Sequence, residues 1–171
     1  GMIIDCARYK MKTASNIFEL IGKTPMVRIN KMNPNSNVEI YAKLEGFNPT
    51  GSLKDRIALR MVERAEEEGE LTKDKIVLEA TSGNTGISVA WVAAIKGYKC
   101  VIVLPKSVSD ERKKILKALG AELVFVPTEV EAIKKARELA KDVRYFMTDQ
   151  FANEMNWKAH YQTTGEEIWE Q

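Results

Sequence analysis

Apolar and polar residues alternate with two different periods along this chain, and the period changes from one stretch to the next. Residues 38–44 alternate with a period of two, which is typical of a strand. Residues 53–68 then place Ile57, Met61 and Ala65 four positions apart, on one face of a predicted helix. The pattern therefore predicts a strand that is followed by an amphipathic helix.

The same alternation of strand and helix continues to the end of the chain. Glycines at positions 69, 97 and 120 are well placed to end three of the helices. Ser109 is a predicted N-cap, and the acidic residues after it suit the positive end of a helix. The further predicted strands are 76–78, 101–105, 122–126 and 145–147, and the further predicted helices are 85–96, 110–119, 129–141 and a stretch from about 155 onward.

This order of elements indicates the fold class. Strands that alternate with helices form βαβ units with right-handed crossovers, so we expect an α/β protein with a parallel sheet and helices on both faces. Such sheets bind ligands beyond the carboxyl ends of their strands. The loops that matter for chemistry are then those after Leu44, Leu78, Leu104 and Met147.

Composition and charge narrow the class of protein. The chain has 171 residues, of which 44% are hydrophobic and 29% charged, as in a soluble globular protein with a sizeable core. The net charge of +2 comes from scattered residues, which argues against nucleic acid as a partner. The longest apolar run, at about 87–95, is too short to cross a bilayer, and no signal-peptide pattern is found. We therefore expect a cytoplasmic protein without a membrane partner.

Few residues are available for metal binding or disulfide bonds. Cys6 and Cys100 are too few and too far apart for a zinc site or a disulfide framework. The apolar run around Cys100 predicts a buried thiol. His160 is the only histidine in the sequence, so a metal site and a Ser-His-Asp triad are both poorly supported. We expect no bound metal.

The loop before the first predicted helix holds a lysine in an unusual place. Ser52 is a good N-cap candidate, so Lys54 falls in the first turn, where the helix dipole disfavours a cation. The same field favours the neutral amine, which is the nucleophilic form. A Schiff-base lysine is therefore a sensible hypothesis beside the ordinary alternative of a solvated lysine. A phosphate-binding P-loop is rejected, because Ser52 stands where that motif requires lysine.

The loop after Leu78 is the second candidate site. It runs from Glu79 to Gly86 and combines hydroxyls, glycines and an asparagine at the start of a helix. Backbone N–H groups and hydroxyls at a helix start form an anion site, and a capped turn without a ligand is the alternative. Because this loop and the Lys54 loop are both expected at the carboxyl edge of the sheet, we favour a small anionic ligand.

Together, the two loops resemble the cysteine synthase and cystathionine β-synthase family, which belongs to the fold-type II pyridoxal-phosphate (PLP) enzymes. The resemblance covers about residues 16–171, and its motifs agree with the family in order and spacing. It is therefore specific at the level of the family. The segments that carry it are 21–28, 48–56, 81–86, 111–112, 119–123, 149–151 and 163–169.

The resemblance implies a β-replacement reaction with PLP as the cofactor. Lys54 would hold PLP as a Schiff base and act as acid and base at the substrate's α-carbon, and Asn84 would hydrogen-bond the cofactor's ring oxygen. An activated serine, O-acetylserine or O-phosphoserine, would lose its β-substituent to give an aminoacrylate, to which sulfide adds to make cysteine. The resemblance also implies a homodimer at full length. The substrate α-carboxylate would be bound by Thr81, Ser82, Asn84, Thr85 and Gln150.

The resemblance further divides the chain into parts. The family's glycine- and threonine-rich loop around the cofactor phosphate is not found in this sequence, and we expect it beyond Gln171. Residues 1–171 alone would then be incomplete and inactive, and Gly1 before Met2 would be a residue left after tag removal. The expected parts are a tail at 1–15, the start of a large domain at 16–45, a small α/β domain at 46–150 and a return into the large domain, cut short, at 151–171.

Two alternatives stay open at the level of the sequence. A cystathionine β-synthase would use homocysteine in place of sulfide in the same kind of reaction. The missing phosphate loop instead supports a non-catalytic fragment or interaction module that kept the small domain. No residue in this sequence separates acetylserine from phosphoserine as the donor.

Overall fold

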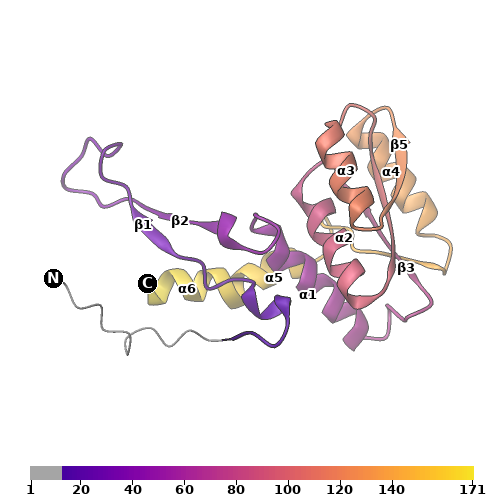
Figure 1. Ribbon diagram of the computed structural model, residues 1–171, viewed down its shortest axis with the longest axis horizontal. Coiled ribbons are helices and arrows are strands. Elements are labelled where there is room, and N and C mark those ends of the chain that lie inside the picture. The colour runs from indigo at the N-terminus through magenta and orange to yellow at the C-terminus, as the bar shows by residue number, and fades with distance from the viewer. Residues whose placement is uncertain (1–12) are drawn as a thin grey trace.

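A four-stranded parallel sheet forms the main body of the molecule (Figure 1). The computed structural model describes residues 13–171, so most of the expected tail, including Cys6, lies outside the described residues. The four strands confirm the predicted parallel sheet, and each lies within two residues of its expected position. In the spatial order of the sheet they are β5 (Glu122–Val126), β4 (Lys99–Pro105), β3 (Ile76–Ala80) and β6 (Tyr145–Met147).

Helices cover both faces of this sheet, as expected. One apolar core lies between the sheet and the helices α1 (Lys54–Glu67), α2 (Asn84–Lys96) and α3 (Asp110–Ala118). A second core lies on the opposite face, under α4 (Glu129–Leu139). Figure 1 shows α2 and α3 together on one side of the strands and α4 on the other.

The strand order contains a reversal that decides where a ligand can bind. From β3 the chain moves outward through β4 to β5, and it then returns to pair β6 with the other edge of β3. The two crossover helices therefore lie on opposite faces, with α2 after β3 on one face and α4 before β6 on the other, which opens a crevice at the carboxyl end of β3. The candidate loops after β3 and β6 both begin at this switch point.

The two central strands are buried on both faces, which explains their continuous apolar sequences. Cys100 lies in β4 with 5% of its surface exposed, so the predicted buried thiol is confirmed. Strand β3 continues to Ala80, two residues beyond its expected end. Glu79 is therefore a residue of a buried strand and not of the loop to which the sequence pattern assigned it.

Several helix boundaries confirm the capping predictions, and one does not. Gly69, Gly97 and Gly120 all adopt positive φ just after a helix, and the Ser109 side chain accepts a hydrogen bond from the Arg112 N–H. Ser52 is not the N-cap of α1, because the helix begins one residue later and Leu53 takes that position. The Ser52 hydroxyl instead accepts a hydrogen bond from the Lys54 N–H, at 3.2 Å.

The first predicted strand does not belong to the parallel sheet. Strand β2 is only Tyr41–Lys43, and it pairs antiparallel with β1 (Met26–Arg28) in a separate two-stranded ribbon. The alternating pattern of residues 38–44 fits such a half-exposed ribbon better than a strand buried on both faces. Figure 1 shows the ribbon at the end of the molecule away from the parallel sheet.

The last part of the chain is helical, as predicted, but it is interrupted. It consists of α5 (Met155–Ala159), a π-helical segment (His160–Thr164) and α6 (Gly165–Glu170). Helix α5 packs its Met155 and Ala159 against α1, whereas Trp169 on α6 is 91% exposed. Two short 3₁₀ helices, Ile17–Leu20 and Glu45–Phe47, complete the elements of residues 13–171.

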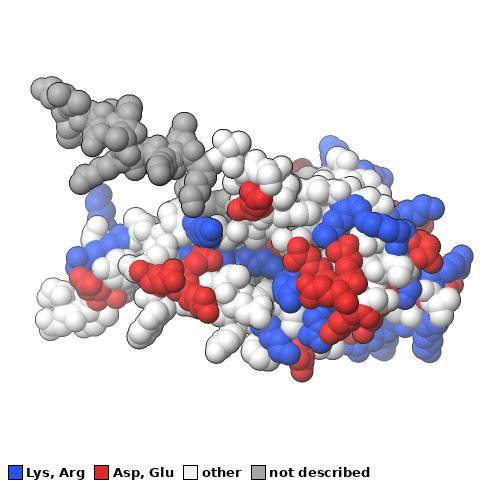
Figure 2. Space-filling model, turned by 90° about the horizontal axis from the view of Figure 1, so that it is seen from below, with Lys and Arg blue, Asp and Glu red and all other residues white. Residues whose placement is uncertain are grey.

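Acidic and basic side chains are interspersed on the surface. Figure 2 shows both signs of charge beside one another on the face in view, in agreement with the scattered charges of the sequence. Among the helices of residues 13–171, none is long and apolar enough to cross a membrane.

Candidate active site

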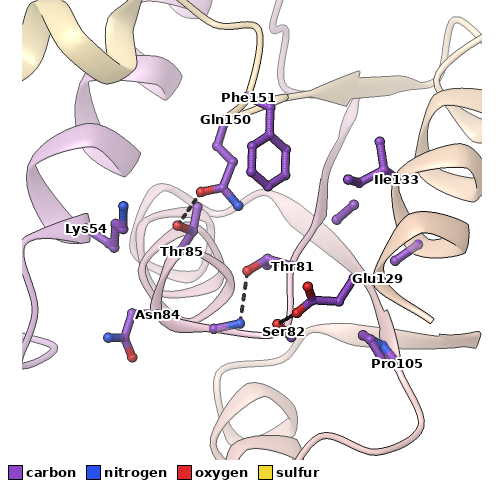
Figure 3. A pocket seen from close by; sticks show the side chains of 13 residues that line it. Lys54, Thr81, Ser82, Asn84, Thr85, Pro105, Glu129, Ile133, Gln150 and Phe151 are labelled. Atoms are coloured by element: carbon purple, nitrogen blue, oxygen red, sulfur yellow. Dashed lines mark hydrogen bonds between the residues drawn. The ribbon is translucent and has the colours of Figure 1, made fainter.

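A single pocket of about 260 Å³ lies at the switch point of the sheet, and all six predicted site residues line it. The loops after β3 and β6 contribute most of its wall, and Lys54 reaches it from the start of α1. In Figure 3, Lys54 and Asn84 lie on one side of the first turn of α2, and Thr81 and Ser82 lie on the other. The predicted residues in its wall are Lys54, Thr81, Ser82, Asn84, Thr85 and Gln150.

Lys54 is held in place by the buried residue that follows it. The Asp55 carboxylate is 0% exposed, and it accepts hydrogen bonds from the Thr50 N–H at 2.8 Å, from the Thr50 hydroxyl, and from the Ser88 hydroxyl of α2 at 2.7 Å. These bonds fasten the loop before α1 to α2. Among residues 13–171, no side chain or carbonyl accepts a hydrogen bond from the Lys54 ammonium. The half-buried amine is therefore available to a ligand.

The loop after β3 approaches helix α2 so closely that only glycine fits at one position. A Cβ atom added to Gly86 would lie 2.6 Å from the Thr81 methyl group. The Thr81 hydroxyl accepts the Gly83 N–H at 3.0 Å, which leaves its own proton free to donate. This close packing fixes the Thr81 hydroxyl at the pocket wall.

The other hydroxyls of the pocket already donate to partners within the protein. Thr85 donates to the Gln150 side-chain oxygen at 2.7 Å, and Ser82 donates to the Glu129 carboxylate (Figure 3). Because the Gln150 oxygen is occupied, its NH₂ group is the part of the amide that can donate to an anion. Of the three hydroxyls in this pocket, the one on Thr81 is thus the donor without a partner in residues 13–171.

Glu79 is a residue that the sequence analysis missed as part of the site. It lies beneath the pocket with 0% of its surface exposed. Burial raises the pKa of its carboxyl to about 7, although hydrogen bonds from Thr148, Ala80 and Gln150 favour the ionised form. Its isolated charge in an otherwise apolar strand is the sequence signal that could have indicated a special role.

The raised pKa of Glu79 predicts a pH-dependent stability. A carboxyl whose pKa rises from 4.5 to about 7 on folding stabilises the fold below pH 4.5 and loses that contribution as the pH rises to about 7. The loss amounts to about 3 kcal/mol, at 1.36 kcal/mol per pKa unit. We expect urea unfolding at pH 5 and pH 8 to show this decrease in the wild type and not in Glu79→Gln.

The comparison between the two proteins removes the effect of other titrating groups. Glu79 interacts electrostatically with Asp149 and with Cys100, and both of these residues are present in the wild type and in Glu79→Gln. Burial lowers the pKa of His160, which affects stability in the opposite direction but equally in both proteins. Equal slopes of stability against pH for wild type and Glu79→Gln would contradict the prediction.

A buried ion network behind the site was also missed. The Arg56 side chain is 1% exposed and contacts the carboxylates of Glu45 at 2.6 Å and Glu167 at 2.5 Å. Lys43 contacts Glu167 at 3.0 Å. Burial opposes ionisation of Glu167, but hydrogen bonds from Arg56 and Lys43 outweigh it and lower the pKa to about 2. The network joins the β1–β2 ribbon, α1 and α6, three elements that are distant in sequence.

The fold and site define a class of protein: an α/β protein with a pocket at the switch point of its sheet, in which a lysine lies beside hydrogen-bond donors suited to a small anionic ligand. Residues 17–171 match the family described as "Pyridoxal-phosphate dependent enzyme". The chain belongs to this family.

Known proteins of similar sequence and structure are cysteine synthases and a related enzyme. A cysteine synthase from Flavobacterium sp. is 52% identical over 90% of this chain and 51% of its own length. The solved structure of a hydrogen sulfide-producing enzyme from Fusobacterium nucleatum has 46% identity and a TM-score of 0.87, over 94% of this chain and 54% of that one. The cysteine synthase structure from Entamoeba histolytica has 37% identity and a TM-score of 0.88, over 95% and 50%. The chain thus spans about half the length of these relatives.

The pocket residues fit the cofactor of the family. PLP requires an amine that is free to react with its carbonyl group, and the Lys54 ammonium has no partner among the described residues. The Asn84 amide lines the same pocket and is exposed, so it can donate to an oxygen of a bound ring. The donor set of the pocket therefore suits the carbonyl end of PLP together with a carboxylate.

Proposed function

We propose that the full-length protein catalyses a β-replacement in which an activated serine, O-acetylserine or O-phosphoserine, reacts with sulfide to give cysteine. The bond from the β-carbon to the leaving oxygen breaks, a bond from the β-carbon to sulfur forms, and acetate or phosphate departs. The observation that carries the proposal is the single pocket that joins Lys54 to the donors of two loops. The cysteine synthases among the relatives support this choice of reaction.

Lys54 is the residue to which we assign both attachment and proton transfer. When bound, PLP withdraws electrons from the substrate's α-carbon and so allows the β-substituent to leave. The amine of Lys54 would hold the cofactor and, once released by the incoming amino acid, would take and return the proton at the α-carbon. Asn84 would orient the ring by donating to its oxygen. Asp55 would keep Lys54 in position through its bonds to Thr50 and Ser88.

The substrate's α-carboxylate is assigned to the donors around the start of α2. Thr81 and the NH₂ group of Gln150 would donate to it directly, because each has a proton without a partner among residues 13–171. Thr85 would act by orienting the Gln150 amide. Ser82 would donate to the carboxylate after releasing Glu129. The backbone N–H groups at the helix start would add to the same site.

A second candidate function is the release of sulfide from cysteine. It is supported by the similarity of this chain to the hydrogen sulfide-producing enzyme of Fusobacterium nucleatum. Two assays on the full-length protein separate the candidates: cysteine formation from O-acetylserine and sulfide, and sulfide release from cysteine. Homocysteine in place of sulfide tests a cystathionine β-synthase activity. Absence of cysteine formation, sulfide release and the reaction with homocysteine in a full-length protein with bound PLP would contradict the proposed function.

The proposal also includes the division into a large and a small domain and a homodimer at full length. Apolar side chains outside the parallel-sheet part of the chain support both, since Leu20, Ile168 and Trp169 are 51%, 53% and 91% exposed. Apolar surface of this kind is usually covered by another part of a protein. Phe18 lies in the same part of the chain but is half-buried, because its ring packs edge-on against the Trp91 ring with 5.4 Å between the ring centroids.

Replacing a carboxylate donor should weaken binding of the amino acid more than binding of the cofactor. We expect Thr81→Ala or Gln150→Ala to lower the affinity for L-serine by about one to two decades, because each removes a hydrogen bond to a charged group. Titration of the cofactor-loaded protein with L-serine, followed by its absorbance, measures the change. Gln162→Ala is the matched control, since Gln162 is exposed and lies outside this pocket. Unchanged amino-acid affinity with lost cofactor would mean that the loop serves PLP instead.

A further inference from the structure

Glu79 combines complete burial with a position directly beneath the proposed carboxylate site. It is the second-last residue of β3, and the loop that contains Thr81 and Ser82 begins immediately after this strand. Its neighbours in β3 and the facing positions in β4 are apolar. An apolar side chain would suit this strand better, since an ionised group pays a large desolvation penalty in such surroundings. The carboxylate therefore requires an explanation that stability does not give.

Three donors from three different residues converge on this carboxylate. The Ala80 N–H donates to Oε1 at 2.8 Å, and the Gln150 N–H donates to Oε2 at 3.0 Å. The Thr148 hydroxyl also donates to Oε2, at 2.6 Å. Only a carboxylate can accept at both ends, because a glutamine of the same shape presents an NH₂ group at one of them. Two of the three bonds join β3 to the turn after β6.

Several other backbone groups of that turn, residues 148–150, also have hydrogen-bond partners. The Thr148 N–H donates to the Leu78 carbonyl at 3.0 Å, and its own carbonyl accepts from the Asn153 side chain at 2.9 Å. The Gln150 carbonyl accepts from the Asn156 side chain at 2.9 Å. The Gln150 N–H has Glu79 as its acceptor. Glu79 is thus the side chain that fastens the start of Gln150 to the sheet.

The turn also contains backbone strain. Asp149 has a φ of +43°, a conformation that residues other than glycine rarely adopt. Such a conformation persists only where the surrounding contacts fix it. Because the bonds from Glu79 reach the residues on both sides of Asp149, they are suited to maintain it. The result is a fixed direction for the Gln150 side chain, which Thr85 then contacts at 2.7 Å.

We propose that Glu79 is a positioning residue: its carboxylate fixes the turn at 148–150 and thereby directs the Gln150 amide toward the α-carboxylate of the amino acid. The identity of the ligand rests on the proposed function, whereas the fixing of the turn rests on the contacts of Glu79 alone. Glu79 itself does not touch the substrate, because it lies beneath the pocket and does not line it.

The test is a double-mutant cycle in the full-length, PLP-loaded protein with Glu79→Gln and Gln150→Ala. We expect Glu79→Gln to lower the affinity for L-serine about tenfold, the effect of one lost hydrogen bond, and to leave kcat less affected. In the Gln150→Ala background, Glu79→Gln should cause no further loss, since the group it positions is absent. Glu122→Gln, the same change at the exposed start of β5, is the control and should leave affinity unchanged.

A second measurement follows the turn itself and does not depend on activity. Hydrogen exchange at the Gln150 amide should be at least about tenfold faster in Glu79→Gln, because a neutral amide offers one oxygen to three donors and so holds the turn less firmly. Stability at pH 8 should not fall, since the variant also removes a buried charge. A merely structural role for Glu79 would instead lower stability and leave the amino-acid affinity unchanged, which would overturn the inference.

The two measurements distinguish failure of this inference from failure of the proposed function. Unchanged exchange at Gln150 in Glu79→Gln overturns the inference, whatever the pocket binds. An equal loss of affinity in both backgrounds also overturns it, because Glu79 would then act independently of Gln150. If Gln150→Ala alone leaves L-serine affinity unchanged, the assignment of Gln150 to the α-carboxylate is wrong. The inference then fails because the proposed function fails, even if Glu79 does fix the turn.

Discussion

Replacing Lys54 with alanine should stop turnover of the full-length protein and abolish the near-visible absorbance of lysine-bound PLP. The reason is that Lys54 is the lysine that lines the pocket, at the first residue of α1, with no hydrogen-bond acceptor for its ammonium among residues 13–171. Without its amine, the cofactor loses its attachment and the substrate's α-carbon loses the proposed acid and base. Absorbance spectra and a sulfide-dependent cysteine assay measure both effects.

Two control variants separate the amine from its charge. Lys54→Arg keeps a cation at this position but should be as inactive as Lys54→Ala, because a guanidinium does not form the attachment. Lys114→Ala, on the exposed face of α3, should retain wild-type activity. Borohydride reduction followed by peptide mapping should place the label on Lys54. Label on another lysine, such as Lys43, would refute the assignment.

Replacing Arg56 with methionine should lower the free energy of unfolding by about 3–5 kcal/mol, the typical effect of removing one partner from a buried ion pair. Its guanidinium satisfies two carboxylates, and their side chains are only 17% (Glu45) and 16% (Glu167) exposed. Methionine fills the space but leaves both charges without their partner. Urea unfolding near pH 7 measures the loss. The pKa of Glu167 should also rise from about 2 toward its usual value.

The next arginine on the same helix provides a matched control. Arg60 forms an exposed ion pair with Glu67 at 3.0 Å, so Arg60→Met should lower stability by no more than about 1 kcal/mol. Combining Arg56→Met with Glu45→Gln and Glu167→Gln should recover part of the loss, because the unpaired charges are then removed. Similar losses for the Arg56 and Arg60 variants would show that burial of the network contributes little.

The response of the ion network to acid follows from the same contacts. Because the folded state lowers the pKa of Glu167, its contribution to stability is complete above pH 4.5 and is lost as the pH falls toward about 2. This window lies below the one in which Glu79 titrates, so the two effects can be measured separately.

Local patterns in the sequence were sufficient for most of the parallel sheet and its helices. The glycines after α1, α2 and α3 were correctly placed, because a left-handed residue after a helix is a property of a few neighbouring positions. The candidate site residues in the loops at 48–56 and 81–86 could also be chosen from the sequence, since each loop holds its polar and reactive groups within one short segment. The four strands of the sheet followed from apolar runs between those helices.

The errors arose where contacts between distant segments decide the structure. Residues 38–44 have the pattern of a strand, but which sheet they join depends on pairing with Met26–Arg28. Ser52 is of a residue type that is common at N-caps, yet α1 begins one residue later than this predicts. The start of the helix is instead fixed by the hydrogen bond between Asp55 and Ser88 of α2. A local pattern does not contain either partner.

The sequence by itself determined the fold class and predicted that Lys54 and the two loops lie at one edge of the sheet, because these features depend on periodicity, capping and short motifs. The tertiary structure alone decided which donors are free. Thr85 and Gln150 are 65 residues apart, and Glu79 and Gln150 are 71 apart. Their hydrogen bonds exist because β6 returns to pair beside β3, and the strand order that brings them together is a property of the whole packed sheet.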